Sequence, residues 1–579
     1  MKFLLVAINA KYIHSNLAVY SLSGYAKKYG NNHNQIEIAE YTINQYTDEI
    51  LRDIFERKPD AIGFSCYIWN ISMVKSIIAD YKKVCPEIPI WLGGPEVSYN
   101  AKQFLLENPE VDYVMYGEGE ETFKNVMDAY EGIRLEPEKL REINGIAFRE
   151  KNDIIITRPQ QPIDLSSIPF VYQDMKRFEN KIIYYETSRG CPFSCSYCLS
   201  SIDKKLRFRN LDLVKEELKF FIDNNTAQVK FVDRTFNCRH DHAMEIWSFI
   251  KENDNGITNF HFEIAADLMT EEEIELISTM RPGLIQLEIG VQSTNEKTLE
   301  AINRKTNLSK IREVTSKIHR VGNIHQHLDL IAGLPFENYR SFTNSFNQVY
   351  AMKPDQLQLG FLKVLHGAMM EDAAKEFQII YSDSAPYEVL KTKWLSFEGI
   401  LNLKAVENVV EIYYNSFQFV NTMNMLEKEF ETAFEMYEKL GRYYKKHSLN
   451  GEKHSRVSRY NILLDFIKQT ADSTKKVAVY KERLALDFYL RENAKTRPEF
   501  AIDISDFKNQ IREFFKSEEA RKVLPDYEKY DSRQIEKMTH VEVFGIDSPN
   551  KSYILFDYKN RNPLNRQAKT VDITKWIKQ

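Results

Sequence analysis

The segment TSRGCPFSCSYCLSS (187–201) holds Cys191, Cys195 and Cys198 in the spacing C-x3-C-x2-C, and these are half of the six cysteines in the chain. Three thiolates can hold three irons of a four-iron cluster and leave the fourth iron open for a ligand. A zinc site would need a fourth Cys or His, and the nearest ones, Cys238 and His240, lie much later in the sequence. The spacing therefore favours an iron–sulfur cluster, with zinc as the alternative.

The residues around the cysteines indicate where they lie in the fold. KIIYYETS (181–188) is rich in β-branched and aromatic side chains and predicts a buried strand, which Arg189-Gly190 then ends. Amphipathic helices separate five further strands of this kind, which we expect at 227–233, 259–265, 284–290, 325–331 and 355–361. These βα units predict a partial (β/α)6 barrel, related to the eightfold parallel barrel, whose chemistry lies at the carboxyl ends of the strands.

The cysteine segment resembles the motif of the radical S-adenosylmethionine (SAM) superfamily, including the aromatic Tyr197 just before the last cysteine. The resemblance implies a [4Fe-4S] cluster on Cys191, Cys195 and Cys198, with the amino and carboxylate groups of SAM on the open iron. It also implies reductive cleavage of SAM to a 5′-deoxyadenosyl radical.

Two later segments, EIGVQST (288–294) and DLIAGLPFE (329–337), resemble motifs that line the SAM site of that superfamily. The resemblance implies SAM contacts from five residues in or near the barrel: Asp233, Glu288, Gln292, Arg304 and Gly333. Arg304 would pair with the SAM carboxylate, to which a guanidinium is well suited. Ordinary alternatives stay open, because Glu288 could be an ion-pair partner inside the barrel and Arg304 a solvated helix charge.

Residues 1–135 predict a separate doubly wound (Rossmann-like) α/β domain. Strand candidates at 2–8, 35–41, 60–66, 88–94 and 111–117 alternate with helices, as in a parallel sheet covered on both faces. Such domains bind ligands beyond the carboxyl ends of their strands. No G-x-G-x-x-G sequence follows the first strand, which argues against a dinucleotide.

LGGPEVSYN (92–100) and YGEGEETF (116–123) resemble the cobalamin-binding domain that precedes many radical SAM domains. The D-x-H-x-x-G motif that gives a histidine to cobalt is absent, so we favour a base-off cobalamin, with His14 as a possible substitute ligand. A domain whose glycines only shape turns is the other interpretation. The resemblance places these residues at the cobalamin: Asn9, Tyr12, His14, Ser65, Gly93, Gly94, Glu96, Gly117, Gly119 and Glu120.

The remaining segments predict a linker and a C-terminal domain. Residues 136–180 carry a predicted hairpin and three prolines at 159, 162 and 169, which is typical of an extended linker before a barrel over 181–370. Residues 371–579 are mainly helical, including 424–446 and 459–470, and end in a predicted β-hairpin. This region resembles an uncharacterised C-terminal domain (DUF4080-like) found behind such modules, where it would cap the substrate or only stabilise the barrel.

Composition limits the function. The chain has 579 residues, a formal net charge of −5 and no apolar run long enough to cross a membrane. Its cysteines, with no signal segment, predict a reducing cytoplasm. A tRNA substrate has no electrostatic support and ranks below a small molecule or peptide.

The sequence therefore predicts a cobalamin-dependent radical SAM enzyme that transfers a methyl group to an unactivated carbon. An electron donor such as flavodoxin or ferredoxin would reduce its cluster. The alternatives are radical redox or rearrangement chemistry without methyl transfer, and a non-enzymatic cobalamin or iron–sulfur sensor.

Overall fold

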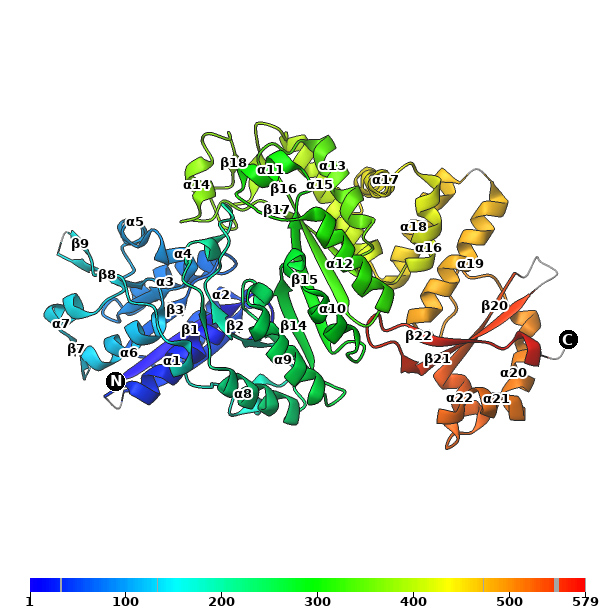
Figure 1. Ribbon diagram of the computed structural model, residues 1–579, viewed down its shortest axis with the longest axis horizontal. Coiled ribbons are helices and arrows are strands. Elements are labelled where there is room, and N and C mark those ends of the chain that lie inside the picture. The colour runs from blue at the N-terminus through cyan, green and yellow to red at the C-terminus, as the bar shows by residue number, and fades with distance from the viewer. Residues whose placement is uncertain (32–33, 133, 152, 472, 546–550, 578–579) are drawn as a thin grey trace. The chain divides into compact units, whose positions relative to one another are not determined.

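The chain divides into two units, which are described separately (Figure 1). Met1–Phe342 and Gly360–Phe397 form the first unit, and Thr343–Leu359 with Glu398–Gln579 form the second. The computed structural model describes residues 1–31, 34–132, 134–151, 153–471, 473–545 and 551–577.

The first unit begins with a seven-stranded sheet of order β2-β1-β3-β4-β5-β8-β9. Its parallel strands are β1 (Lys2–Asn9), β2 (Gln35–Thr42), β3 (Ala61–Ser65), β4 (Ile90–Gly93) and β5 (Tyr113–Met115). The helices between them are α1 (Leu17–Tyr29), α2 (Thr47–Glu56), α3 (Ile71–Val84), and the short α4 (Pro95–Ser98) and α5 (Ala101–Glu107); α6 (Gly119–Ala129) follows β5. Side chains of β1 alternate between two buried cores, Leu4 and Val6 in one, Phe3 and Leu5 in the other. Both faces of this strand are therefore covered, as the doubly wound prediction requires.

The hairpin predicted inside the linker belongs to this sheet. β8 (Ile146–Glu150) and β9 (Asp153–Ile156) form an antiparallel pair, and β8 pairs with β5. The extended connection is thus shorter than predicted. It begins after β9, and the short helical turns Leu165–Ser167 and Met175–Phe178 interrupt it.

The second sheet is the barrel sheet, of order β10-β13-β14-β15-β16-β17. Its strands are β10 (Ile183–Tyr185), β13 (Gln228–Phe231), β14 (Asn259–Ile264), β15 (Ile285–Gln292), β16 (His325–Ala332) and β17 (Gln356–Phe361), and neighbours from β10 to β16 are parallel. Strands β10 to β16 belong to the first unit, and the division between the units falls within β17, after Leu359. The six predicted βα strands are confirmed.

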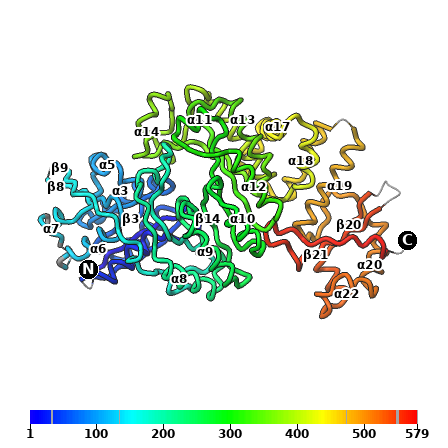
Figure 2. The backbone as a smooth tube through the Cα atoms, viewed as in Figure 1, coloured from blue at the N-terminus to red at the C-terminus, as the bar shows by residue number. Residues whose placement is uncertain are grey.

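Helices cover one face of the barrel sheet. They include α8 (Leu211–Asp223), α9 (His240–Glu252), α10 (Glu271–Ser278) and α12 (Leu308–Val321). In this layer α8 contacts α9, α9 contacts α10, and α10 contacts α12 (Figures 1 and 2). Along β14, β15 and β16 every second residue is buried and apolar or neutral, whereas the residues between them are only partly buried. Those intervening residues form the inner face, which is largely polar and includes His261, Glu288 and His327. An open barrel with a polar inner face can admit polar ligands.

The second unit is mainly helical. Its longer helices are α15 (Phe397–Val410), α16 (Val420–Leu426), α17 (Ala433–Lys446), α18 (Arg456–Thr470) and α19 (Thr474–Arg491). The predicted helical stretch 424–446 is broken between α16 and α17, where the Thr432 side chain caps α17 by accepting from the Glu435 N–H. The predicted terminal hairpin has a third strand, since β20 (Thr539–Phe544), β21 (Ser552–Arg561) and β22 (Ala568–Asp572) form one antiparallel sheet.

Two glycines at the carboxyl edge of the N-terminal sheet allow a test of the backbone conformation there. Gly94 has φ +110° and a Cβ there would lie 2.5 Å from the Cys66 carbonyl oxygen, whereas Gly117 has φ +77° and open space around a Cβ. Both Gly→Ala changes should cost about 1–2 kcal/mol of backbone strain. Gly94→Ala should lose more stability than Gly117→Ala, because only Gly94 adds a clash with backbone. Chemical denaturation of cobalamin-free protein measures this, and equal losses would contradict it.

Candidate functional site

The three predicted cluster ligands lie on one loop after the short strand β11 (Ser188–Arg189). The Cys191 N–H donates to the Asp203 carbonyl at 2.9 Å, and the Cys198 N–H donates to the Cys195 carbonyl at 3.1 Å. All three thiols are free, Cys191 and Cys195 are each 7% exposed, and Cys198 is partly buried. Backbone hydrogen bonds therefore hold three thiols on one short loop at the mouth of the barrel.

Arg304 lies against this loop from the segment after α11 (Glu296–Ala301). Its Nη1 donates to the Cys195 Sγ at 3.6 Å and to the Tyr197 hydroxyl at 3.3 Å, and its Nη2 donates to the Gly290 carbonyl. Burial lowers the pKa of Arg304, but the combined effect of Tyr197 and Cys195 raises it by more. The net shift of the pKa is therefore upward. The sequence placed Arg304 at SAM, and the structure brings this fixed positive charge beside a cysteine sulfur.

These residues fit an iron–sulfur cluster with an open iron. Three free thiols share one loop, and the adjacent guanidinium offsets negative charge on the sulfurs and has room for one more acceptor, since its buried Nε has no hydrogen-bond partner among the described residues. An anionic ligand such as a carboxylate suits that remaining donor.

Asp233 accepts hydrogen bonds from the residues that lead into the cluster loop. Its carboxylate accepts from the Thr187 N–H and the Ser188 hydroxyl, both at 2.9 Å, and from the Thr187 hydroxyl. Asp233 is 0% exposed, and burial raises its pKa to about 7. The structure thus gives Asp233 a supporting position where the sequence predicted a cofactor contact.

The other predicted SAM residues lie on β15 and on the loop after β16. Gln292 ends β15 with φ +70°, and its buried Oε1 has no hydrogen-bond partner among the described residues. Gly333 has φ +86°, and a Cβ there would lie 2.7 Å from Val389 Cγ1. Glu288 lies deeper, where its Oε2 is 3.0 Å from both Lys230 Nζ and His261 Nε2. Burial raises the pKa of Glu288, but His261 and Lys230 lower it well below its usual range.

The predicted cobalamin residues lie together at the carboxyl edge of the N-terminal sheet, although several are already paired. Asn9 donates to Glu40 at 3.0 Å, and the Ser65 hydroxyl accepts from Asn16 at 3.3 Å. His14 Nδ1 lies 2.6 Å from the Tyr184 hydroxyl, so one ring nitrogen is engaged with the first barrel strand.

Other parts of that edge are open. Tyr12 is 67% exposed, and nothing lies within 4 Å of a Cβ built at Gly117. Gly93 ends β4, and Gly119 begins α6. Exposed aromatic side chains and glycines beyond the strand ends fit a flat cofactor such as a corrin.

A buried ion-pair cluster, which we call the Arg189 bridge, joins the cluster loop to the N-terminal sheet domain. Arg189 Nη2 donates to Glu120 Oε1 at 2.7 Å and to Glu186 Oε2 at 2.8 Å. Beside it, Arg207 donates to Glu118, which also accepts from the Ile163 N–H at 2.8 Å. Glu120, predicted at cobalamin, therefore holds the residue two positions before Cys191.

Sequence reasoning missed two of these contacts. Arg189 was noted only as the end of a strand, although acidic residues in YGEGEETF and basic residues near the cysteines are a matching charge pattern. The hydroxyl of Tyr387 donates to Glu96 at 2.9 Å, and this residue lies in a stretch that the sequence assigned to the C-terminal domain. Nothing in the local sequence of Tyr387 indicates that partner.

Three stretches of the chain match known families. Residues 4–127 match the B12 binding domain, residues 185–349 match the Radical SAM superfamily, and residues 375–562 match a protein family of unknown function, DUF4080. The chain is therefore a radical SAM protein with an N-terminal B12-binding domain and a C-terminal DUF4080 domain. The radical SAM domain implies a [4Fe-4S] cluster and SAM, and the B12-binding domain implies cobalamin.

Curated relatives match parts of the chain. A 2-(S-pantetheinyl)-carbapenam-3-carboxylate methyltransferase from Streptantibioticus cattleyicolor is 26% identical over 50% of this chain and 45% of that protein. An anaerobic magnesium-protoporphyrin IX monomethyl ester cyclase from Rubrivivax gelatinosus is 22% identical over 58% of this chain and 61% of that protein. The chain thus spans about half the length of these relatives.

A solved structure supports the fold. The cobalamin-dependent SAM radical enzyme OxsB, with aqua-cobalamin and SAM bound, has a TM-score of 0.57 at 14% identity, covering 84% of this chain and 79% of that one. This confirms the predicted combination of a Rossmann-like domain and a partial barrel. Among the described residues, no helix combines the length and hydropathy needed to cross a membrane.

The Arg189 bridge can be tested by removing one charge. Glu120→Gln leaves Arg189 with one fewer carboxylate in a mostly buried position, which should cost about 1–3 kcal/mol. Hydrogen exchange should become faster both in the cluster loop and at the start of α6. Glu121→Gln is the matched control, because Glu121 is the next residue and accepts a hydrogen bond at 2.7 Å from the uncharged Gln160. If the two variants behave alike in denaturation and exchange, the bridge does not couple the domains.

Proposed function

We propose that this protein is a cobalamin-dependent radical SAM methyltransferase that acts on an unactivated carbon of a small molecule or peptide. The observation that carries the proposal is the cluster loop with Arg304 at its sulfur, joined through Arg189 to a B12-binding domain. A B12-binding domain fixed beside the SAM-cleaving loop suits a reaction in which both cofactors serve one substrate.

We assign the residues of the chain the following roles in binding the cluster and SAM. Cys191, Cys195 and Cys198 hold the cluster, and the unfilled donor of Arg304 pairs with the SAM carboxylate. Gln292, with an unpaired buried amide oxygen at the strand end, accepts a hydrogen bond from SAM. When bound, the cofactors supply the radical and the methyl group, and the protein supplies their orientation and excludes water.

The second candidate is a radical cyclisation or redox reaction without methyl transfer. The observation that favours it is the similarity to the magnesium-protoporphyrin IX monomethyl ester cyclase, over a larger share of this chain than the methyltransferase covers. Both candidates need a low-potential electron donor such as flavodoxin or ferredoxin, which fits a cytoplasmic enzyme.

Anaerobic reconstitution tests the proposal. Protein with its cluster, SAM, methylcobalamin and a reductant should form 5′-deoxyadenosine. On extracts of cells that lack the gene, it should also form S-adenosylhomocysteine and one product that is 14 Da heavier. 5′-Deoxyadenosine with a product of another mass would favour the cyclisation candidate. No SAM cleavage would contradict both and favour a sensor.

Arg304 offers a sharper test of the SAM site. Arg304→Ala should weaken SAM binding at least about tenfold, because a charge-assisted pair to the carboxylate is lost. Arg304→Lys should recover part of the affinity, since it restores the charge without the planar fork. Equilibrium dialysis with labelled SAM measures this on samples matched for iron content, which controls for the contact with Cys195. Unchanged affinity in the alanine variant would remove Arg304 from the site.

A further inference from the structure

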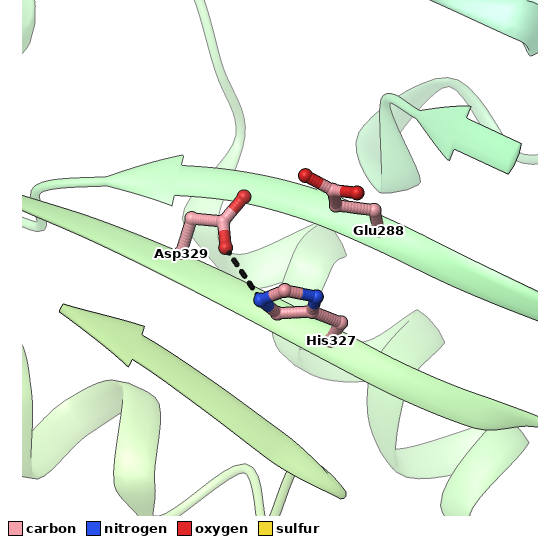
Figure 3. Close-up of side chains that lie close together, drawn as sticks. All are labelled: Glu288, His327 and Asp329. Carbon is pink, nitrogen blue, oxygen red and sulfur yellow. Dashed lines mark ion pairs between the residues drawn. The ribbon is translucent and has the colours of Figure 1, made fainter. Parts of the chain in front are cut away.

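A cluster of metal-binding side chains lies inside the barrel, away from the cysteine loop. Glu288 on β15 and His327 on β16 are directly paired across the two strands, and Asp329 lies two residues further along β16 (Figure 3). One ligand atom from each of Glu288, His327 and Asp329 lies within 4.8 Å of the others. We propose that these three side chains bind a divalent first-row transition metal ion.

The hydrogen bonding of this cluster leaves acceptors unfilled. His327 Nε2 and Asp329 Oδ1 form an ion pair at 3.0 Å (Figure 3), and among the described residues neither buried atom has a hydrogen bond to any further group. Buried polar atoms are normally paired, and an unpaired set commonly marks a missing ion or water. Their convergence on one point favours an ion.

Glu288 is also arranged as a metal ligand would be. Lys230 Nζ and His261 Nε2 both lie 3.0 Å from Oε2, whereas no hydrogen bond to Oε1 comes from the described residues. Oε2 of Glu288 is therefore held in place, and Oε1 is available to bind a metal ion. Metal-binding carboxylates are typically fixed in this way by an outer set of partners.

The donor set selects the class of ion. One imidazole nitrogen with two carboxylates suits Mn²⁺, Fe²⁺ or Zn²⁺. Ligand bonds of about 2.1 Å separate neighbouring ligand atoms by roughly 3–4 Å, so the observed spacing needs only small side-chain movements to close. Glu263 on β14 is directly paired with Glu288, so three carboxylates, including Asp329, face each other here. The cations beside them are Lys230 and Arg234, and the third carboxylate leaves negative charge for a dication to neutralise.

The depth of the cluster separates it from the expected SAM position. Strands rise about 3.3 Å per residue, so Glu288 lies roughly 13 Å below Gln292 at the end of β15. His327 lies similarly far below the end of β16. The metal assignment therefore replaces the SAM contact that the sequence predicts for Glu288. An ion there would offer open positions to an oxygen of a substrate that enters the barrel.

Mn²⁺ binding tests the proposal without SAM, cobalamin or substrate, so its outcome is independent of the proposed function. Full-length protein with an oxidised, EPR-silent cluster should hold one Mn²⁺ per chain, and pulsed EPR should detect nitrogen coupling from a single imidazole. His327→Gln should remove that coupling and weaken binding at least about tenfold. His325→Gln is the matched control, because His325 lies on the same strand and face, and it should retain both.

Two results would overturn the metal site. One is the absence of stoichiometric Mn²⁺, which would show a closed ion-pair network neutralised by Lys230. The other is nitrogen coupling that persists in His327→Gln, which would place the ion elsewhere. If circular dichroism shows that His327→Gln does not fold, the parent protein decides the question, because bound Mn²⁺ without imidazole coupling also contradicts the assignment.

Discussion

The Arg189 bridge is the constraint on which the arrangement of the first unit depends. Arg189 lies two residues before the first cluster cysteine and is only 22% exposed. The two carboxylates that accept its hydrogen bonds come from different domains, and a third, that of Glu118, lies 3.6 Å away. Glu186 lies three residues before Arg189 in the barrel domain, and Glu120 is the second residue of α6 in the B12-binding domain. A guanidinium that is desolvated between two carboxylates is costly to separate from either of them. The bridge thus fixes the cluster loop and the cobalamin edge relative to each other.

Around that bridge, the two sheets use their faces differently. The N-terminal sheet buries both faces under helices and leaves its carboxyl edge uncovered near Gly117, where the sequence predicts cobalamin. The barrel sheet buries one face and presents polar side chains on the other. One domain therefore offers an edge to a flat cofactor, and the other offers a polar interior. The three-thiol loop with Arg304 lies at the mouth of that interior.

Most of the fold was predictable because the pattern of apolar residues along the chain indicates its strands and helices. All five predicted strands of the N-terminal domain and all six of the barrel are present, since buried parallel strands give continuous apolar runs between helices. β22 was missed because AKTVD (568–572) is a mostly exposed edge strand without an apolar pattern. The break before α17 was missed although Thr432 and Glu435 have the spacing of a helix cap.

The site was predictable only where a motif carries it. The cysteine spacing predicts the cluster loop and family motifs point to Arg304 and Gln292, and the roles of these residues stay predictions. Ion pairs between distant segments leave no periodic signal, so the partner of Arg189 and the cluster of Glu288, His327 and Asp329 required the folded chain. The sequence also placed Asp233 at a cofactor, because a strand-end carboxylate looks the same whether it faces a ligand or, as here, the Thr187 backbone beneath a loop.

The central claim is that the two cofactor-binding parts of the first unit are held at one fixed separation. Pulsed dipolar EPR between cob(II)alamin and the reduced cluster measures that separation directly in the full-length protein. The account predicts a single narrow distance distribution before any substrate is added. A broad or multiply peaked distribution would contradict it, because the domains would then move independently despite the Arg189 bridge.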